Sequence, residues 1–236
     1  MKVVRINLGV VLILFFSFYA MAQKSPQGTV RLKSSKTGVK HATFIDIIEV
    51  TIQYWRDFLY WTELQYGKES AEYAELLPDS TIFAESRLKF GYPAYRNHPM
   101  IGISYEQAMK YCAWRSDMLN EWLKLQKNKK KYGYTVTYSL PSETDFQVAY
   151  KQQKIKTDYK ELTDVTKYRC NHWISYKMCK PKKGKIGYIA DNAQEITANK
   201  TVITGEDAGK LIFEPYQEPN AKTGFRCVAE IELIKK

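Results

Sequence analysis

The stretch that most constrains the fold runs from His98 to Asn120 (HPMIGISYEQAMKYCAWRSDMLN), and it predicts an extended strand that leads directly into a long helix. The apolar run 100–103 is followed by Ser104, whose hydroxyl can cap a helix, and Gln107 completes a capping box three residues later. Mainly apolar residues then recur at three- and four-residue spacing. We therefore expect one buried helix face that carries a cysteine inward, formed by Ala108, Cys112, Arg115, Leu119 and Trp122.

The first 22 residues are typical of a secretory signal peptide. Lys2 and Arg5 precede an apolar run over 8–19, and Ala20-Met21-Ala22 supplies the small residues that a signal peptidase reads. A transmembrane anchor is the alternative, but the apolar run is short for a bilayer span. No cysteine lies near the cleavage point, so we expect no bacterial lipid anchor. The pattern predicts an exported protein, either periplasmic or associated with the outer membrane.

The positive net charge of the chain indicates which classes of partner it attracts. The chain has 36 Lys and Arg against 25 Asp and Glu, a net charge of +11, and removal of residues 1–22 leaves 34 against 25, or +9. A basic exported protein is attracted to anionic lipid, lipopolysaccharide, peptidoglycan or an acidic protein. Nucleic acid is not expected as a partner after export. The densest positive run forms either a solvated helix end or a docking patch, which would consist of Lys124, Lys127, Lys129, Lys130 and Lys131.

The remaining pattern predicts one domain of short strands and two or three helices. Residues 23–40 are polar and indicate a flexible segment with one short strand over 29–32, whereas 41–236 form the domain. A strand is expected over 43–48 and another over 135–140, where polar and apolar residues alternate. Residues 69–88 are poorly patterned and indicate a surface helix or an insertion.

Two more helix starts can be identified. Thr51 can cap a helix that Gly67 ends, and Ser142 with Asp145 can start another helix by capping-box logic. Aromatic residues make up 14% of the chain, and we expect most of them in the core and a few on a recognition surface. The helix after Thr51 is expected to bury a broad apolar face made of Tyr54, Trp55, Phe58, Leu59 and Leu64.

Cys170 and Cys179 form a close pair in the sequence. In an exported chain the default expectation is a disulfide that closes this ten-residue hairpin. The alternative is a metal site in which His172 joins the two thiolates, although no fourth ligand can be identified. Both alternatives remain open.

Residues 98–120 resemble the "HPVVNVSWEDAVAYCRWL" signature of the formylglycine-generating-enzyme (sulfatase-modifying factor) domain family, which has a C-type-lectin-like α+β fold. They are similar in particular to the gliding-motility and type IX secretion lipoproteins of the GldK/GldJ type, which share the Cys-x-Trp-Arg ending. Four other segments resemble family motifs in the same order: TFIDIIEVTIQYWRDF (43–58), LPSETDFQVAYK (140–151), YIADNAQEIT (188–197) and TGFRC (223–227). The resemblance therefore covers most of 41–236.

The resemblance implies two structural features. In enzymes of the family the cysteine of the signature helix is bridged to the cysteine of the closing strand, which implies a disulfide between Cys112 and Cys227. The family loop that matches 188–197 supplies oxygen ligands to calcium, so Asn192 and Glu195 either bind calcium or only hydrogen-bond the loop. This loop departs from the family at three positions, where a glycine and two tryptophans are replaced by Asp191, Gln194 and Ile196.

Neither known active site of the family can be transferred to this chain. The copper enzymes need a further cysteine pair late in the domain, but residues 199–223 contain no cysteine and no histidine. The sulfoxide-synthase relatives bind iron through three histidines, and the histidines of this chain are not spaced like that triad; they are His41, His98 and His172. We therefore expect no catalytic residue and no cofactor other than the calcium considered above.

The resemblance implies a non-catalytic structural or protein-binding component of a bacterial cell-envelope assembly, in gliding motility or type IX secretion. The expected partners are envelope proteins of such a complex, together with peptidoglycan or the outer-membrane surface. One alternative is an oxygen- and copper-dependent cysteine oxidase in which Cys170 and Cys179 bind the copper. Another is a glycan- or peptidoglycan-binding module that depends on Asn192 or Glu195.

Overall fold

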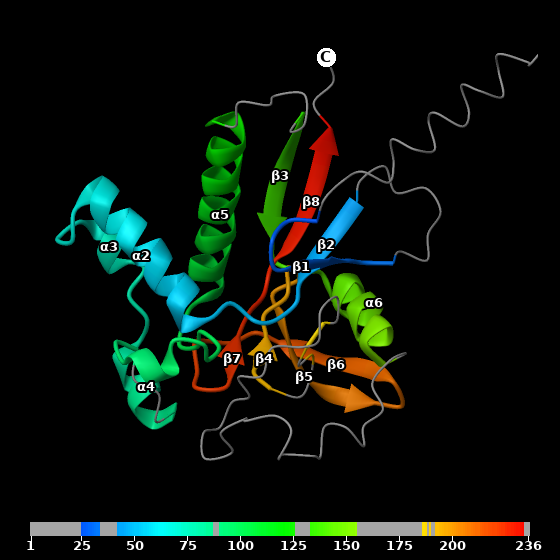
Figure 1. The fold of residues 1–236 in the computed structure, drawn as a ribbon. Coiled ribbons are helices and arrows are strands. Elements are labelled where there is room, and N and C mark those ends of the chain that lie inside the picture. The colour runs from blue at the N-terminus through cyan, green and yellow to red at the C-terminus, as the bar shows by residue number, and fades with distance from the viewer. Residues whose placement is uncertain are drawn as a thin grey trace, which may run out of the picture.

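The computed structural model describes residues 25–33, 42–86, 90–125, 133–154, 186–187, 189 and 192–233. They form an α+β fold, as predicted, around a four-stranded antiparallel sheet in the order β1-β2-β8-β3 (Figure 1). The strands of this sheet are β1 (Thr29–Arg31), β2 (Ala42–Asp46), β8 (Val228–Leu233) and β3 (Tyr134–Ser139). The C-terminal strand β8 thus lies in the middle of the sheet.

Successive residues of a strand point to opposite sides of the sheet, and on β2 both sides are buried at Phe44 and Ile45. Farther along, Thr135 and Thr137 of β3 and Glu230 of β8 are exposed. Helix α5 (Tyr105–Leu125) covers one face, where Phe44 of β2 joins Cys112 in the main hydrophobic cluster. Helix α6 (Glu143–Lys154) covers the other face, where Ile45 of β2 joins Phe146 in a second cluster. The sheet is therefore a central layer between two helices.

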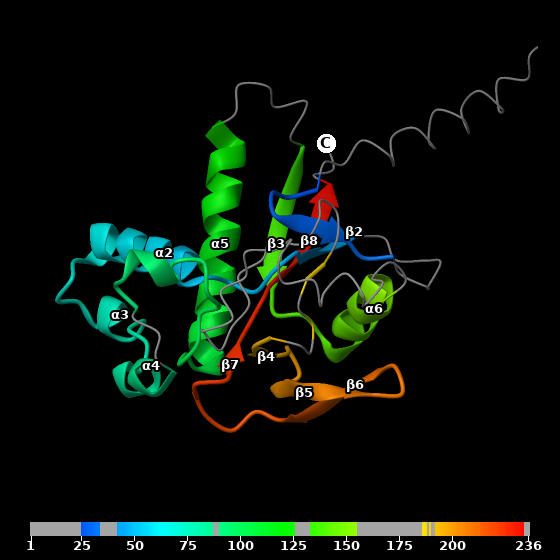
Figure 2. The ribbon, with the colours of Figure 1, turned by 60° about the horizontal axis from the view of Figure 1, so that its bottom comes forward.

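A hairpin closes one end of the domain (Figure 2). Strand β5 (Thr201–Asp207) pairs with β6 (Lys210–Pro215) across a turn in which Ala208 and Gly209 both have positive φ. Beside it, β4 (Gln194–Glu195) pairs in parallel with β7 (Thr223–Gly224). Leu211 of β6 is buried in the same cluster as α6, so the hairpin extends the second core.

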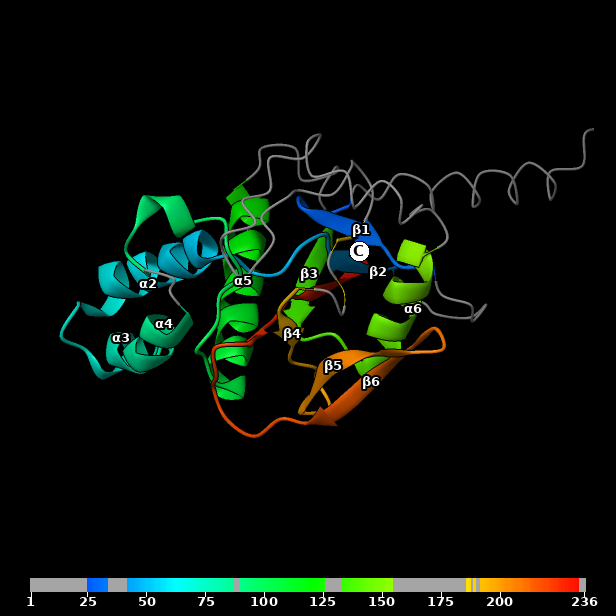
Figure 3. The ribbon, with the colours of Figure 1, turned by 90° about the horizontal axis from the view of Figure 1, so that it is seen from below.

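Helices α2 (Ile52–Tyr66), α3 (Ala71–Ala74) and α4 (Ser80–Ser86) lie on the side of α5 that faces away from the sheet (Figure 3). We refer to residues 52–86 as the α2–α4 lobe; a short 3₁₀ helix, η1 (Pro93–Tyr95), follows it. Phe58 of α2 packs on Tyr111 and Trp114 of α5, with ring centroids 5.7 and 4.9 Å apart. In the described part of the chain, no helix is long and apolar enough to cross a bilayer.

The predicted helix starts are confirmed. The N–H of Gln107 donates to Oγ of Ser104 at 3.0 Å, and the N–H of Ser104 donates to Oε1 of Gln107 at 2.7 Å. The same reciprocal bonds join Ser142 and Asp145, at 3.1 and 2.9 Å. The hydroxyl of Thr51 caps α2 by accepting an N–H bond three residues later. Each capping interaction joins residues only three positions apart, which explains why the sequence pattern was sufficient to predict these helix starts.

The strand predicted over 100–103 is not formed. Its residues are buried, but Gly102 has a φ of 67°, which interrupts an extended backbone. Just before this run, Pro99 forms an isolated antiparallel bridge with Thr51. Strand β2 also ends at Asp46, two residues before its predicted end.

Two predicted helix faces are wrong in part. On α5, Trp122 is 50% exposed and Leu123 is buried instead. Eleven residues make about three helical turns, so Leu123 returns to the side of Cys112, whereas Trp122 is rotated away from it by about 80°. On α2, Tyr54 and Leu64 were expected in the core but are 51% and 60% exposed.

Candidate functional site

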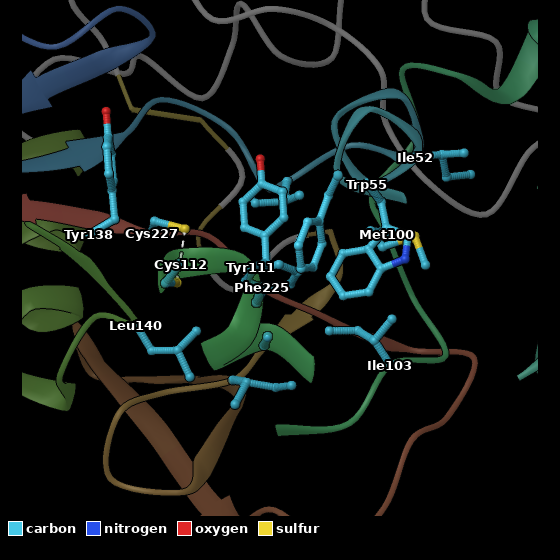
Figure 4. Packing of buried hydrophobic residues seen from close by; sticks show 14 of the residues in the cluster. Ile52, Trp55, Met100, Ile103, Tyr111, Cys112, Tyr138, Leu140, Phe225 and Cys227 are labelled. Carbon is cyan, nitrogen blue, oxygen red and sulfur yellow. Dashed lines mark hydrogen bonds between the residues drawn. The ribbon is translucent and has the colours of Figure 1, made fainter. Parts of the chain in front are cut away.

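Two cysteines meet in the core between α5 and the start of β8. The Sγ atoms of Cys112 and Cys227 lie 3.2 Å apart, and both side chains are buried (Figure 4). A disulfide requires an S–S distance of about 2.05 Å, so the structure holds two thiols in contact. The fold thus brings together the pair that the family resemblance implies, and the covalent bond stays a prediction.

An ion pair lies beside these thiols. Arg115 donates to both carboxylate oxygens of Asp46, at 2.7 and 2.9 Å, and the backbone N–H of Cys227 donates to the same carboxylate at 2.9 Å. The guanidinium carbon of Arg115 also lies 4.1 Å from the ring centre of Tyr138, a cation–π contact. Sequence reasoning placed Arg115 on an apolar face and missed this pair. The available signal was Asp46, an isolated acid in an apolar strand.

These surroundings keep the Cys112 thiol protonated. Its hydrogen bond with Cys227 and its burial raise the pKa of Cys112 well above its usual value, and the negative charge of Asp46 acts in the same direction. Burial likewise raises the pKa of Tyr138 to about 12. Because a metal ligand or nucleophile must be a thiolate, the reduced pair is poorly suited to copper binding or to nucleophilic attack.

A second ion pair is fully buried. Arg226 donates through Nε and Nη2 to the two carboxylate oxygens of Glu195, and neither side chain is exposed to solvent. The same guanidinium donates to the carbonyl oxygens of Asp46 at 3.2 Å and Gly187 at 2.9 Å. Burial, the largest single influence, lowers the pKa of Arg226, but the charge and hydrogen bonds of Glu195 together with the charges of Glu49 and Asp46 outweigh burial and raise the pKa. Arg226 therefore stays charged, and its hydrogen bonds join β4, β2 and the start of β8.

The residues expected to bind calcium have protein partners instead. Asn192 donates through Nδ2 to Oε1 of Glu49 at 2.7 Å, and both oxygens of Glu195 accept from Arg226. Calcium needs several oxygen ligands free to face it. Among the described residues, no three His, Cys, Asp or Glu side chains group closely enough to hold a metal ion. The partners of Asn192 and Glu195 thus tie their loop to Glu49 and Arg226, and calcium binding by these two residues stays a prediction.

His98 and Lys124 both contact other residues of the chain. His98 is buried, its Nδ1 lies 3.2 Å from the carbonyl oxygen of Tyr95, and burial lowers its pKa. Lys124 is exposed and pairs with Glu121 at 2.6 Å. The other predicted sites lie outside the described residues; they are the signal peptide 1–22, His41, Lys127, Lys129, Lys130, Lys131, Cys170, His172 and Cys179.

The outer side of α2 carries a group of exposed large side chains. Tyr60, Trp61 and Leu64 are 57%, 45% and 60% exposed. At 3.6 residues per turn they fall within an arc of about 100°. We call these three residues the α2 aromatic face. The opposite side of the helix is buried and consists of Ile52, Trp55, Phe58, Leu59 and Thr62.

One comparison with known proteins, the match to a family model, supports the sulfatase-modifying factor part of the resemblance. The solved structure of Treponema denticola variable protein 1 is similar at 17% sequence identity, over 79% of this chain and 84% of that chain, with a TM-score of 0.45. No curated protein matches the sequence. Residues 11–198 match the model of the sulfatase-modifying factor enzyme 1-like domain. The chain therefore belongs to the sulfatase-modifying factor enzyme 1-like domain family.

Proposed function

We propose that this protein is a non-catalytic, protein-binding component of a bacterial cell-envelope assembly, in gliding motility or type IX secretion. The setting follows from the sequence resemblance to lipoproteins of those systems. The observation that carries the proposal is the α2 aromatic face, with Tyr60, Trp61 and Leu64 open to solvent. Exposed apolar patches often mark interaction sites, and Tyr and Trp are enriched at protein interfaces.

The placement of the cysteines supports a non-catalytic role. Cys112 and Cys227 are buried against each other, and the pKa of Cys112 is raised. Residues 199–223, where the copper enzymes carry their cysteine pair, contain no cysteine or histidine and include the β5–β6 hairpin. Cys170 and Cys179 are the remaining cysteines of the sequence, so a test for catalysis must include them.

Export to the envelope is part of the same proposal. It rests on the signal-peptide pattern of residues 1–22 and on the net charge of +9 that remains after their removal. Cell fractionation and N-terminal sequencing of the mature protein check it. Recovery of the uncleaved chain from the cytoplasm would contradict export.

Two measurements on the exported protein test the function. First, the protein is incubated with copper(I), oxygen and cysteine-containing peptides, and mass spectrometry follows the peptides; we expect their cysteines to remain unchanged. Second, envelopes are cross-linked in the cells that carry the protein, and we expect a defined complex larger than the monomer. Copper-dependent conversion of a peptide cysteine to an aldehyde, abolished by Cys170→Ser, would establish the oxidase instead. A cross-linked sample that contains only monomer would contradict a role in an assembly.

A further inference from the structure

The α2–α4 lobe differs in charge from the rest of the chain. Residues 52–86 contain seven Asp and Glu against two Lys and Arg, a net charge of −5, whereas the whole chain carries +11. The other residues together therefore carry +16. The lobe lies beyond α5, away from the central sheet (Figure 3). Since salt screens charges over about 10 Å, the lobe presents its own negative field.

Several acidic side chains of the lobe face solvent. Glu63, Glu69 and Glu72 are exposed, and none of them forms an ion pair with another described residue. Glu75 differs, because it pairs with Lys110 of α5 and so helps to hold the lobe against the domain. Unpaired carboxylates at the surface remain available to a partner that brings its own positive charges.

The α2 aromatic face lies on the same lobe. The rings of Tyr60 and Trp61 have centroids 6.2 Å apart and are inclined at 70°, and Leu64 follows one turn later. Lys and Arg suit such a mixed surface, since their charged ends bind carboxylates while their alkyl stems and the guanidinium plane pack on aromatic rings. Complementary charge also speeds and orients the encounter.

From these observations we infer that the α2–α4 lobe binds a lysine- and arginine-rich surface of a partner protein, through the α2 aromatic face and the exposed carboxylates of the same lobe. The inference rests on the proposed protein-binding function and adds to it the surface used and the chemistry of the partner. An anionic lipid or glycan surface would be repelled by the lobe and attracted to the basic remainder of the chain.

The test uses the full-length exported protein and two lobe variants with matched controls. Tyr60→Ala/Trp61→Ala removes the aromatic rings, and its control is Trp122→Ala, which truncates a half-exposed aromatic residue on α5. The charge variant neutralises three exposed acids of the lobe: Glu63→Gln, Glu69→Gln and Glu72→Gln. Its control neutralises three exposed acids elsewhere: Asp207→Asn, Glu214→Gln and Glu218→Gln. Circular dichroism confirms that each variant is folded.

Affinity is measured for a fluorescent peptide of Lys, Arg and Gly and for a second peptide in which Glu replaces the basic residues. We expect each lobe variant to lose about tenfold or more in affinity for the basic peptide, and the controls to change little. Any binding of the acidic peptide to the basic remainder of the chain should be the same in the wild type and the lobe variants. Equal affinity in lobe variants and controls would overturn the inference. So would homo-oligomers of the purified protein that only the lobe variants abolish, because the occupant would then be a second copy.

Cross-linking of envelopes distinguishes a failure of the lobe inference from a failure of the proposed protein-binding function. We expect the lobe variants to be missing from the complex that the wild type and the controls enter. If the lobe variants enter it equally, the inference fails while the proposed function stands. If the wild type itself enters no complex, the proposed function fails and the inference fails with it.

Discussion

Loss of the Glu195 carboxylate is expected to be among the most destabilising single changes in this domain. Glu195→Gln keeps the size of the side chain but removes the main counter-charge of the Arg226 guanidinium, at a site where neither residue is exposed. Water cannot replace the lost carboxylate without local opening of the core. The change therefore tests whether the buried pair is a structural link between β4 and the start of β8.

The magnitude follows from the contacts of Arg226. Removal of one partner of a buried ion pair costs about 3–5 kcal/mol. The carbonyl oxygens of Asp46 and Gly187 still accept from the guanidinium, so we expect the lower part of this range, about 3–4 kcal/mol, for Glu195→Gln. Arg226→Met should cost more, because it removes the counter-charge of Glu195 and also the hydrogen bonds that Arg226 donates to both carbonyl oxygens.

Urea unfolding followed by circular dichroism measures the free energy of unfolding for each variant. Each curve is recorded with EDTA and with calcium, because calcium binding is the other role considered for Glu195. We expect the same loss in both. A loss below about 1 kcal/mol, the value of an exposed ion pair, would refute the reasoning, as would a smaller loss for Arg226→Met than for Glu195→Gln. A loss seen only with calcium would assign Glu195 to a metal site.

Three further outcomes are expected. In the exported protein Cys112 and Cys227 should be linked, and reduction should lower the free energy of unfolding by about 4–5 kcal/mol, because the bond closes a loop of 115 residues. Non-reducing peptide mapping and urea unfolding with reductant check this. Recovery of both cysteines as free thiols would contradict it. In the reduced protein, stability should fall as the pH rises above about 8.5, because the raised pKa of Cys112 keeps the folded thiol protonated while the unfolded thiol ionises; the linked protein is the control. Ser104→Ala should cost about 1 kcal/mol through loss of the cap on α5, as measured by urea unfolding, and an unchanged midpoint would show that the cap is dispensable.

The helix starts could be predicted because capping is local, but the buried side of α2 could be predicted only in part. That helix carries large apolar or aromatic residues on nearly every side, so its periodicity leaves the choice open. Distant residues decide it: the ring of Trp55 packs on Tyr111 and Phe225, with centroids 5.8 and 6.1 Å apart. The same cause explains why Tyr60 and Trp61 are exposed, although their residue types favour burial.

The candidate site could be predicted only in part. The meeting of Cys112 and Cys227 was accessible through family resemblance, whereas the ion pairs were not. Arg115 reaches an acid 69 residues earlier, and Arg226 reaches one 31 residues earlier. Local patterns do not show which distant residue is the partner. They can indicate that a partner exists, because a charged residue inside an apolar motif is rarely buried without one.

The packing of α2 also affects how the exposed face can work. Trp55 is fully buried, and its Nε1 donates to the carbonyl oxygen of Leu76 at 3.1 Å, so one side chain fixes α2 both to the core and to the segment after α3. The backbone beneath Tyr60 and Trp61 is therefore ordered before any partner arrives. Ordering of side chains and loops is a large part of the free energy lost on association. Folding has already ordered the helix that a partner of the α2–α4 lobe meets, so association loses less conformational entropy there. A stable complex can therefore form even where the contact area is small.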